Sequence, residues 1–310
     1  MIFAARGIMV SLAFFALLYS FLSLLLVVAW SCLSACKRRK DLTPDALFTL
    51  RVIPFATSAA ICLFLTLPSF FLLEAHSLDE DLGTFVLAGG ALLFFGAGIY
   101  RVWTAETRTR RVVSQCLKGA VDLKHGAVPP AMILPRSVMP LMLVGIRMPR
   151  ILISESARDL LSDAELRAAM RHETEHLRSR DNLKKAILNL LLFPGMGSLE
   201  KAWQEASEWA ADDGAVSSRD EALDLAAALI KLTRHFPYQA TPELATGLVS
   251  VADSVTTRVE RLLAWKKSHI VRPNHWLYSA ALGFTAFMCL AAKLGPALVL
   301  AHRLTERLVP

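Results

Sequence analysis

The residues best suited to chemistry form the run His172-Glu-Thr-Glu-His176, just past the middle of the chain. In a helix, a spacing of four residues places both imidazoles on one face, so that each can offer a nitrogen to the same metal ion. Glu173 projects beside them, where it can act as the catalytic base and take a proton from metal-bound water. This is the His-Glu-x-x-His pattern of zinc peptidases, although five residues can also match it by chance on a solvated helix face.

Two histidines leave a tetrahedral zinc one protein ligand short, with water in the fourth position. The next predicted helix offers four carboxylates, those of Glu205, Glu208, Asp212 and Asp213. The first three share one helical face, because they are three and four residues apart. Spacing alone does not choose among them. Since a ligating histidine usually donates its other N–H to a carboxylate, this helix can supply both a ligand and its support.

A helix must present the motif, and the sequence predicts one. Ser162-Asp-Ala-Glu165 has the Ser-x-x-Glu form of a capping box, and the helical pattern continues to about Phe193, where Pro194-Gly195 ends it. Further helices are expected at about 104–120, 198–215, 220–234 and 256–267.

Short apolar runs broken by proline and glycine precede this helix and predict a small sheet. The runs are 131–135, 141–146 and 151–153. An exposed edge of the 141–153 strands can bind an extended substrate by strand addition, but packed core strands fit the pattern equally well. A few strands followed by helices predict an α+β domain.

The remaining sequence is too apolar for an ordinary soluble domain, since 54% of the 310 residues are hydrophobic. The excess lies in four blocks, each long enough to supply the about 20 residues that cross a bilayer. We expect three transmembrane helices within residues 1–103, an α+β domain over 104–272, and a fourth helix and a short tail over 273–310. The first three spans are expected at about 8–30, 52–74 and 83–103.

The distribution of Lys and Arg predicts the orientation. Basic residues lie between the first two blocks (37–40 and Arg51), after the third (101–111) and before the fourth (266–272), whereas the turn between the second and third is acidic. The positive-inside rule then places both termini outside and 104–272 in the cytoplasm. These clusters account for much of the net charge of +7 and would contact anionic membrane lipid, so no direct nucleic-acid binding is expected.

His172 to His176, the following stretch to Asp181, and Glu208-Trp-Ala-Ala-Asp212 together resemble two related families of membrane zinc peptidases. One comprises the heat-shock and CAAX-processing metalloproteases, the other the bacterial β-lactam-sensor (antirepressor) peptidases. The resemblance implies a zincin-like domain that binds one Zn2+ per chain through His172, His176 and Glu208. It also implies that Asp212 supports these ligands, and Asp181 matches a recurrent acidic position.

The sensor family is the more similar of the two. Residues 149–153 and 161–166 resemble its approach to the active site, and 257–262 resemble a late helix of both families. This likeness implies a multi-pass protein of the bacterial plasma (inner) membrane that cleaves a cytoplasmic or membrane-associated protein, such as a helix-turn-helix repressor, in signal transduction. The family's extracellular penicillin-binding domain does not follow the last span here, so direct β-lactam sensing is not expected.

Two other functions fit the same sequence: a heat-shock-type quality-control protease, and a non-enzymatic membrane signalling scaffold. The intact motif argues against the scaffold. A peptidase also needs a donor near the developing oxyanion, and Arg258 or Tyr238 can supply one, although nothing in their spacing establishes either.

Reporter fusions test the predicted topology. We expect a fusion after Lys118 to score as cytoplasmic and one at Arg303 to score as external, because the Lys and Arg asymmetry agrees at every loop. An external signal from any fusion within 104–272 would contradict the topology and the cytoplasmic placement of the motif.

Overall fold

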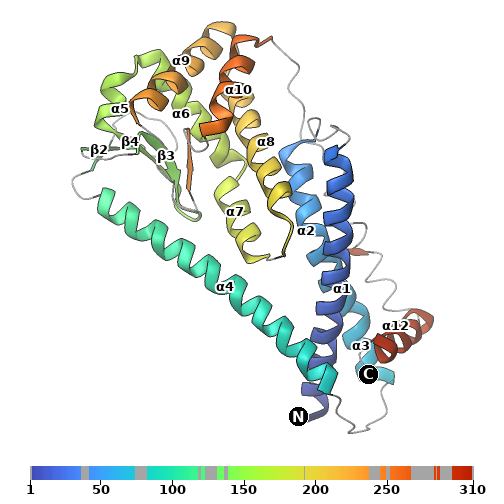
Figure 1. Ribbon diagram of the computed structural model, residues 1–310. Coiled ribbons are helices and arrows are strands. Elements are labelled where there is room, and N and C mark those ends of the chain that lie inside the picture. Colours follow the sequence, from blue (N-terminus) through green and yellow to red (C-terminus); the bar gives the residue numbers. More distant parts are fainter. Residues whose placement is uncertain are drawn as a thin grey trace. The chain divides into compact units, whose positions relative to one another are not determined.

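The computed structural model describes residues 2–35, 42–73, 82–117, 120–122, 131–135, 139–191, 193–236, 245–248, 252–266, 283, 285–286 and 295–308. Most of these residues are helical (Figure 1). The chain divides into two compact units. One comprises Met1–Ile99, Leu190–Glu200 and Val271–Pro310, and the other comprises Tyr100–Asn189 and Lys201–Ile270.

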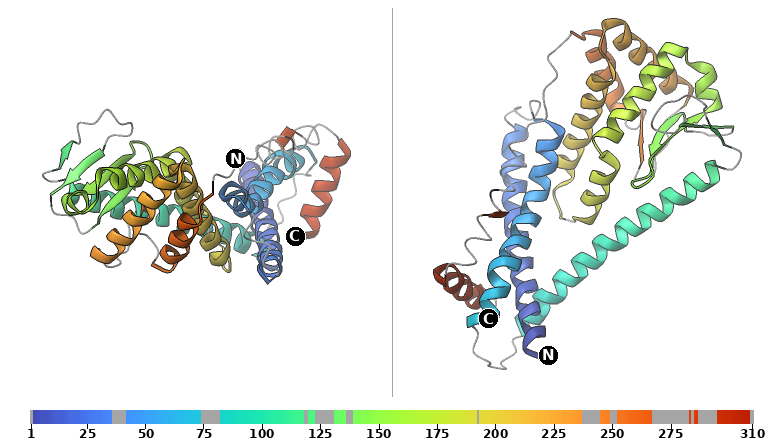
Figure 2. Two further views of the ribbon diagram at one scale, coloured as in Figure 1. Left: turned by 90° about the horizontal axis from the view of Figure 1, so that it is seen from above. Right: turned by 180° about the vertical axis from the view of Figure 1, so that it is seen from behind.

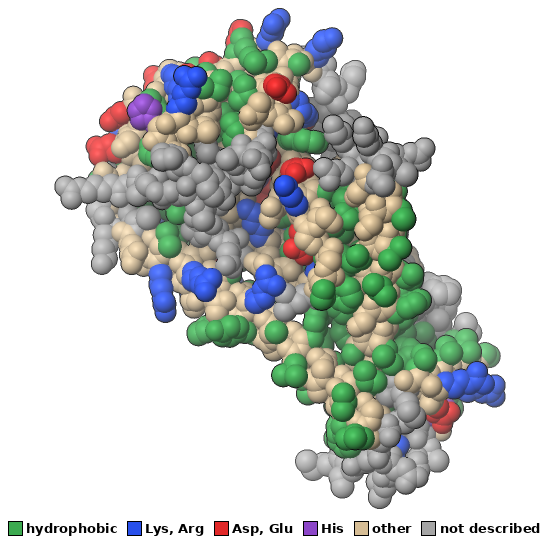
Figure 3. Space-filling model, in the orientation of Figure 1, with side chains coloured by type: hydrophobic (Ala, Val, Ile, Leu, Met, Phe, Trp, Pro, Cys, Tyr) green, Lys and Arg blue, Asp and Glu red, His purple; other side chains and the backbone are tan. Residues whose placement is uncertain are grey.

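Three helical segments in the described part of the chain are long and apolar enough to cross a membrane. They are α1 (Ile2–Ala35), the run of α2, η2 and α3 from Pro44 to Leu73, and α4 (Leu82–Cys116). They coincide with the first three predicted spans. Apolar side chains gather over α1 and α2, and basic ones over the second half of α4 (Figure 3). The protein therefore has the helices of a membrane protein.

The predicted fourth span falls largely outside the described residues. Helix α12 (Gly295–Leu308) covers its end. The described residues thus contain three candidate spans where the sequence predicts four.

The second span contains a π-helical stretch that the sequence analysis did not predict. η2 (Cys62–Thr66) lies between α2 (Pro44–Ile61) and α3 (Leu67–Leu73). Pro68 has no N–H for the regular helical bond, and the N–H of Leu67 reaches back five residues to the carbonyl of Cys62. A wider turn of this kind accommodates a proline without ending the helix.

Arg51 is not the loop cation that the sequence indicates. It lies inside α2 with 2% of its side chain exposed. Its Nε donates to a carboxylate oxygen of Glu200 at 3.0 Å, and its Nη2 donates to the carbonyl of Leu191. The Arg51 side chain therefore binds the segment from Leu191 to Glu200, which belongs to the same unit as the first two spans.

The predicted sheet is present and mixed, with the strand order β1-β2-β4-β3-β5. Its strands are β1 (Val121–Asp122), β2 (Ala131–Leu134), β3 (Leu141–Val144), β4 (Arg150–Ser154) and β5 (Ala245–Gly247). β2 and β4 are parallel and the other pairs are antiparallel. Because β3 lies between β4 and β5, and β4 between β2 and β3, the structure has packed core strands at 141–153, the second of the two predicted alternatives, and not an exposed edge.

Helices cover both faces of the sheet (Figures 1 and 2). Leu143 and Ile151 point into a core shared with α6 (Asp163–Arg178) and α9 (Arg219–His235). Met142 and Leu152 point to the opposite face and pack near Val113, at the end of α4. This alternation is that of a sheet buried on both sides. The other helices of the unit are α5 (Glu155–Leu160), α7 (Asp181–Leu190), α8 (Gly197–Ala215) and α10 (Ala252–Leu263).

The predicted capping box starts α6. The Ser162 hydroxyl accepts from the Glu165 N–H at 3.3 Å, and the Ser162 N–H donates to the Glu165 carboxylate at 2.8 Å. Lys231 of α9 also donates to this carboxylate, at 2.7 Å. The start of the motif helix is therefore fixed both locally and by a second helix.

The helix predicted to run unbroken to Phe193 is instead divided. α6 ends at Arg178 and α7 begins at Asp181, with Arg180 in the left-handed region at φ 55°. No proline or glycine marks this break, so helical periodicity could not reveal it. The break places Asp181 at the start of α7, where a carboxylate is favoured by the helix dipole.

Ser162→Ala tests the cap. Loss of the side-chain acceptor should reduce the free energy of unfolding by about 1 kcal/mol. Thermal unfolding of the full chain in detergent, followed by circular dichroism, should then show a midpoint lower by about 2–4 °C. Ser156→Ala, at an exposed position of α5, is the control. Equal midpoints in the two variants would contradict the assigned cap.

Candidate metal site

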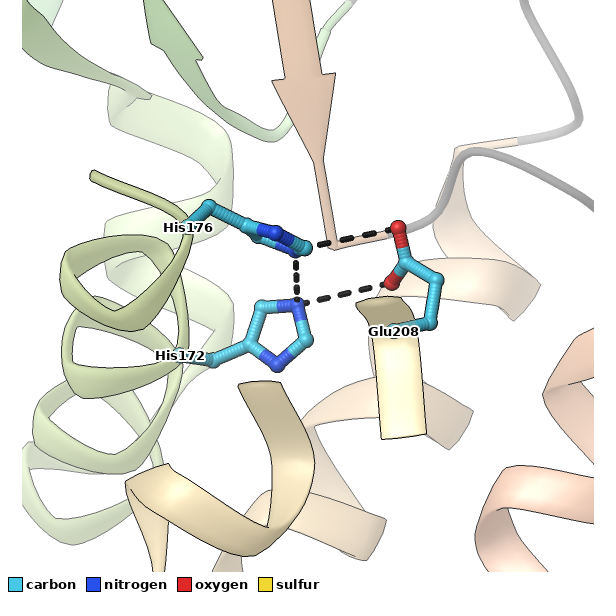
Figure 4. Close-up of side chains that lie close together, drawn as sticks. All are labelled: His172, His176 and Glu208. Carbon is cyan, nitrogen blue, oxygen red and sulfur yellow. Dashed lines mark hydrogen bonds and ion pairs between the residues drawn. The ribbon is translucent and has the colours of Figure 1, made fainter. Parts of the chain in front are cut away.

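The motif residues lie on the buried face of α6. His172, Glu173 and His176 have no exposed surface. The two imidazoles cross nearly at right angles, and their Nε2 atoms lie 3.0 Å apart (Figure 4). The four-residue spacing therefore brings two nitrogens to one buried point, as the sequence predicts.

Glu208 of α8 meets both nitrogens. One carboxylate oxygen lies 3.5 Å from Nε2 of His172 and the other 3.7 Å from Nε2 of His176 (Figure 4). The three side chains can each offer one ligand atom within 4.8 Å of the others, so this buried group could hold a metal ion. Glu205 is not part of the group, and Asp213 pairs with Arg261 at the surface.

Each imidazole has a carboxylate on its other nitrogen. Nδ1 of His176 lies 2.7 Å from Asp181, and Nδ1 of His172 lies 3.0 Å from Asp212. At His176 the carboxylate accepts a hydrogen bond, which favours the tautomer with hydrogen on Nδ1 and a lone pair on Nε2. At His172 the guanidinium of Arg258, whose Nη2 lies 3.5 Å from Nε2, favours a lone pair on the same nitrogen. Two lone pairs and the carboxylate of Glu208 then point at one another. The guanidinium of Arg258 contacts Glu208 at 2.8 Å and offsets part of the resulting repulsion, and a cation among the three ligand atoms would offset the rest, so the residues fit a metal ion.

The pKa of His176 shows the same preference for a cation. Burial alone lowers the pKa of this imidazole, but the Glu208 carboxylate and the hydrogen bond with Asp181 outweigh burial and raise the pKa to about 10. An environment that stabilises a proton so strongly also stabilises a metal cation, which competes with that proton for the same nitrogen.

Glu173 differs from the other carboxylates of the site. Neither of its oxygens has a hydrogen-bond partner among the described residues, although the side chain is fully buried. Burial raises the pKa of its carboxyl to about 7, opposed by the neighbouring histidines. A carboxylate with a pKa near neutrality and no fixed partner is suited to accepting and releasing a proton.

Arg258 of α10 holds the acidic side of the site together. It is 1% exposed, and its Nε and Nη2 donate to the two oxygens of Asp212 at 2.8 and 2.7 Å. Its Nη1 lies 2.8 Å from Glu208 and donates to the carbonyl of Leu248 at 2.9 Å. These contacts favour a positioning role for Arg258, and contact with a substrate carbonyl stays a prediction. Tyr238, the other predicted donor, lies outside the described residues.

Sequence reasoning missed Lys185. It follows Asp181 by one turn of α7, and its ammonium donates to the carbonyl of Ala245 in β5 at 2.7 Å. Burial lowers the pKa of Lys185, and the nearby carboxylates of Glu208 and Asp181 oppose that shift. The periodicity of α7 places Lys185 on the face of Asp181, and this was the clue available in the sequence.

The charges of the site also favour a cation. With both imidazoles neutral, four carboxylates face three cations, so the site keeps a net negative charge that a bound cation would offset. The groups are Glu173, Asp181, Glu208 and Asp212 on one side, and Lys184, Lys185 and Arg258 on the other.

No protein-family model matches the chain, and the chain matches no curated protein. The likeness to membrane zinc peptidases therefore stays a prediction from the sequence motifs.

Three substitutions on α8 test the ligand set. Glu208→Ala should abolish stoichiometric metal binding, because it opens the coordination sphere. Asp212→Ala should weaken binding about 10–100-fold, as expected for a residue that supports a ligand. Glu205→Ala is the matched control and should bind metal like the wild type. The readout is metal content by elemental analysis of the purified full chain, with affinity from competition against a chelator. Full occupancy in Glu208→Ala with loss in Glu205→Ala would reverse the assignment.

Proposed function

We propose that this protein is a membrane-embedded zinc endopeptidase that cleaves a cytoplasmic or membrane-associated protein. One observation carries the proposal. Two imidazole nitrogens and the Glu208 carboxylate converge at a buried point, immediately beside a buried glutamate that has no hydrogen-bond partner among the described residues. Metal ligands alone would fit a structural site, but the adjacent Glu173 supplies the base that a hydrolase needs.

The donor set favours zinc. Ligands at about 2.0–2.2 Å from a tetrahedral ion lie about 3.3–3.6 Å apart, and the distances here are 3.0, 3.5 and 3.7 Å. Two imidazoles and one carboxylate form a common ligand set of catalytic zinc, which keeps its fourth position open for water or substrate.

Bound zinc would supply Lewis acidity towards a peptide carbonyl and towards water. Glu173 takes the proton of the attacking water while the new C–O bond forms, and returns it to the amide nitrogen as the C–N bond breaks. Asp181 and Asp212 keep the lone pairs of His176 and His172 directed at the ion. Arg258 in turn fixes Asp212 and Glu208, so the acidic groups keep their geometry through the proton transfers.

The biological role follows from the resemblance to the β-lactam-sensor peptidases. We infer a zincin-like domain on the cytoplasmic side of a bacterial plasma membrane, four spans, and signalling by cleavage of a transcriptional repressor. The three candidate spans support the membrane location. Broad degradation of unfolded proteins, with no preference for a repressor, would favour a quality-control role instead.

Glu173→Gln tests the mechanism. This variant should keep one zinc per chain, because Glu173 is not a ligand, and should lose at least about 100-fold in peptidase rate, because general-base catalysis is lost. The two measurements are zinc content and the rate at which the full chain cleaves a helix-turn-helix repressor and an unfolded protein. Glu175→Gln, two residues along the same helix and outside the metal group, is the matched control and should retain activity. Loss of zinc from Glu173→Gln would show that its assigned role is wrong.

A further inference from the structure

The segment that joins α7 to α8 belongs to the unit that contains the first two candidate spans. This unit includes Leu190–Glu200, whereas the rest of α7 and of α8 belongs to the unit that contains the sheet. α7 begins with Asp181, which hydrogen-bonds to His176, and α8 carries Glu208 of the metal group. The segment therefore connects two helices that both contribute to the metal site.

Three helices of its own unit contact this segment. From α1, the ring of Tyr19 meets that of Phe193 edge to face, with the centroids 5.8 Å apart. From α4, Gly98 approaches Leu190 so closely that a Cβ at Gly98 would overlap the carbonyl oxygen of Leu190. From α2, Arg51 supplies the polar contacts. The ends of α7 and α8 are therefore held by packing within this unit.

Arg51 joins the end of α7 to the start of α8. Its Nη2 donates to the carbonyl of Leu191, the residue after α7, and its Nε donates to Glu200, in the first turn of α8, at 3.0 Å. A cation stabilises the unpaired carbonyls at the end of a helix, and a carboxylate stabilises the start of one. Nη1 has no hydrogen-bond partner among the described residues. Within the described part of the chain, the guanidinium therefore bonds only to these two helix ends.

The direction in which α8 presents Glu208 follows from how its first turn is held. α8 is one uninterrupted helix, so Glu208 lies about 12 Å along the axis from Glu200, at a fixed angle around it. Glu205 lies about 60° from Glu208 around the same axis, so a rotation of that size would exchange the two carboxylates. A contact that restricts rotation at Glu200 therefore determines which carboxylate can meet the imidazoles.

We propose that Arg51 is a positioning residue for the metal site: it fixes the start of α8 and, through this helix, the direction of Glu208. The inference rests on the proposed function, because it takes Glu208 as a zinc ligand. Lysine cannot reproduce the contacts of Arg51, since an ammonium lacks the rigid fork with which a guanidinium binds two acceptors. A role limited to membrane topology needs only a positive charge, which lysine supplies equally well.

The zinc affinity of the purified full chain, measured by competition against a chelator, tests the proposal. Arg51→Gln removes both contacts and should weaken zinc binding about tenfold, the lower end of the range for residues that support a ligand. Arg51→Lys keeps the charge but at most one contact, and should weaken binding at least about threefold. Glu200→Gln should weaken it about threefold and have no further effect in the Arg51→Gln chain. Lys201→Gln, at the exposed next position of α8, is the matched control and should bind zinc like the wild type.

X-ray absorption of the zinc-loaded chain separates positioning from a general loss of structure. The imidazoles belong to α6, to which the side chain of Arg51 makes no described hydrogen bond. Zinc-loaded Arg51→Lys should therefore keep both imidazole nitrogens, while the mean zinc–oxygen distance increases relative to the wild type and to Lys201→Gln. Loss of the imidazole contribution with an unchanged oxygen distance would overturn the proposal.

Wild-type zinc affinity in either Arg51→Lys or Glu200→Gln would also overturn it, as would additive effects of Arg51→Gln and Glu200→Gln. If the Arg51 variants do not fold, the nearly isosteric Glu200→Gln decides, since this side chain is 34% exposed. The proposed function has a separate test, because it fails if Glu208→Ala retains zinc. Loss of zinc from Glu208→Ala, with wild-type affinity in Arg51→Lys and Glu200→Gln, would contradict only the role of Arg51.

Discussion

The structure of the unit that contains the sheet depends on one electrostatic constraint: two imidazole nitrogens and a carboxylate converge at a buried point. Such an arrangement needs positive charge beside it, which Arg258 supplies in part and which a proton or a metal ion among the three groups would complete. The surrounding contacts fix the orientation of these three side chains. Asp181 and Asp212 direct the imidazoles, and Arg258 joins Asp212 to Glu208. Each of these groups comes from a helix end or a helix face that the fold must hold in place.

Much of this arrangement can be predicted because it is local. The motif, the capping box at Ser162 and the acidic face of α8 are read from spacings of three and four residues, and the structure contains all three. Spacing could not show whether Glu208 or Glu205 is the third ligand, since both lie on one face. It depends on the rotation of α8 relative to α6, which tertiary packing determines.

What the sequence did not reveal depends on contacts between distant residues. The break before Asp181 has no glycine or proline, and Asn182 next to it is held by carbonyls of β3 and the following turn, 37–39 residues earlier. Arg51 has the charge of a topology determinant, but its partners Leu191 and Glu200 lie 140–149 residues later and bury it. Lys185 looks like a surface lysine until β5 is placed beside it. In each case a polar side chain is given its role by a partner that periodicity cannot identify.

X-ray absorption at the zinc edge of the purified, zinc-loaded full chain tests the central claim most directly. Binding by His172, His176 and Glu208 predicts two imidazole nitrogens at about 2.0–2.1 Å and oxygen at about 2.0–2.2 Å, with one zinc per chain. A sulfur scatterer at about 2.3 Å, or a spectrum with no imidazole contribution, would contradict the account, because the ion would then be bound by residues outside this group.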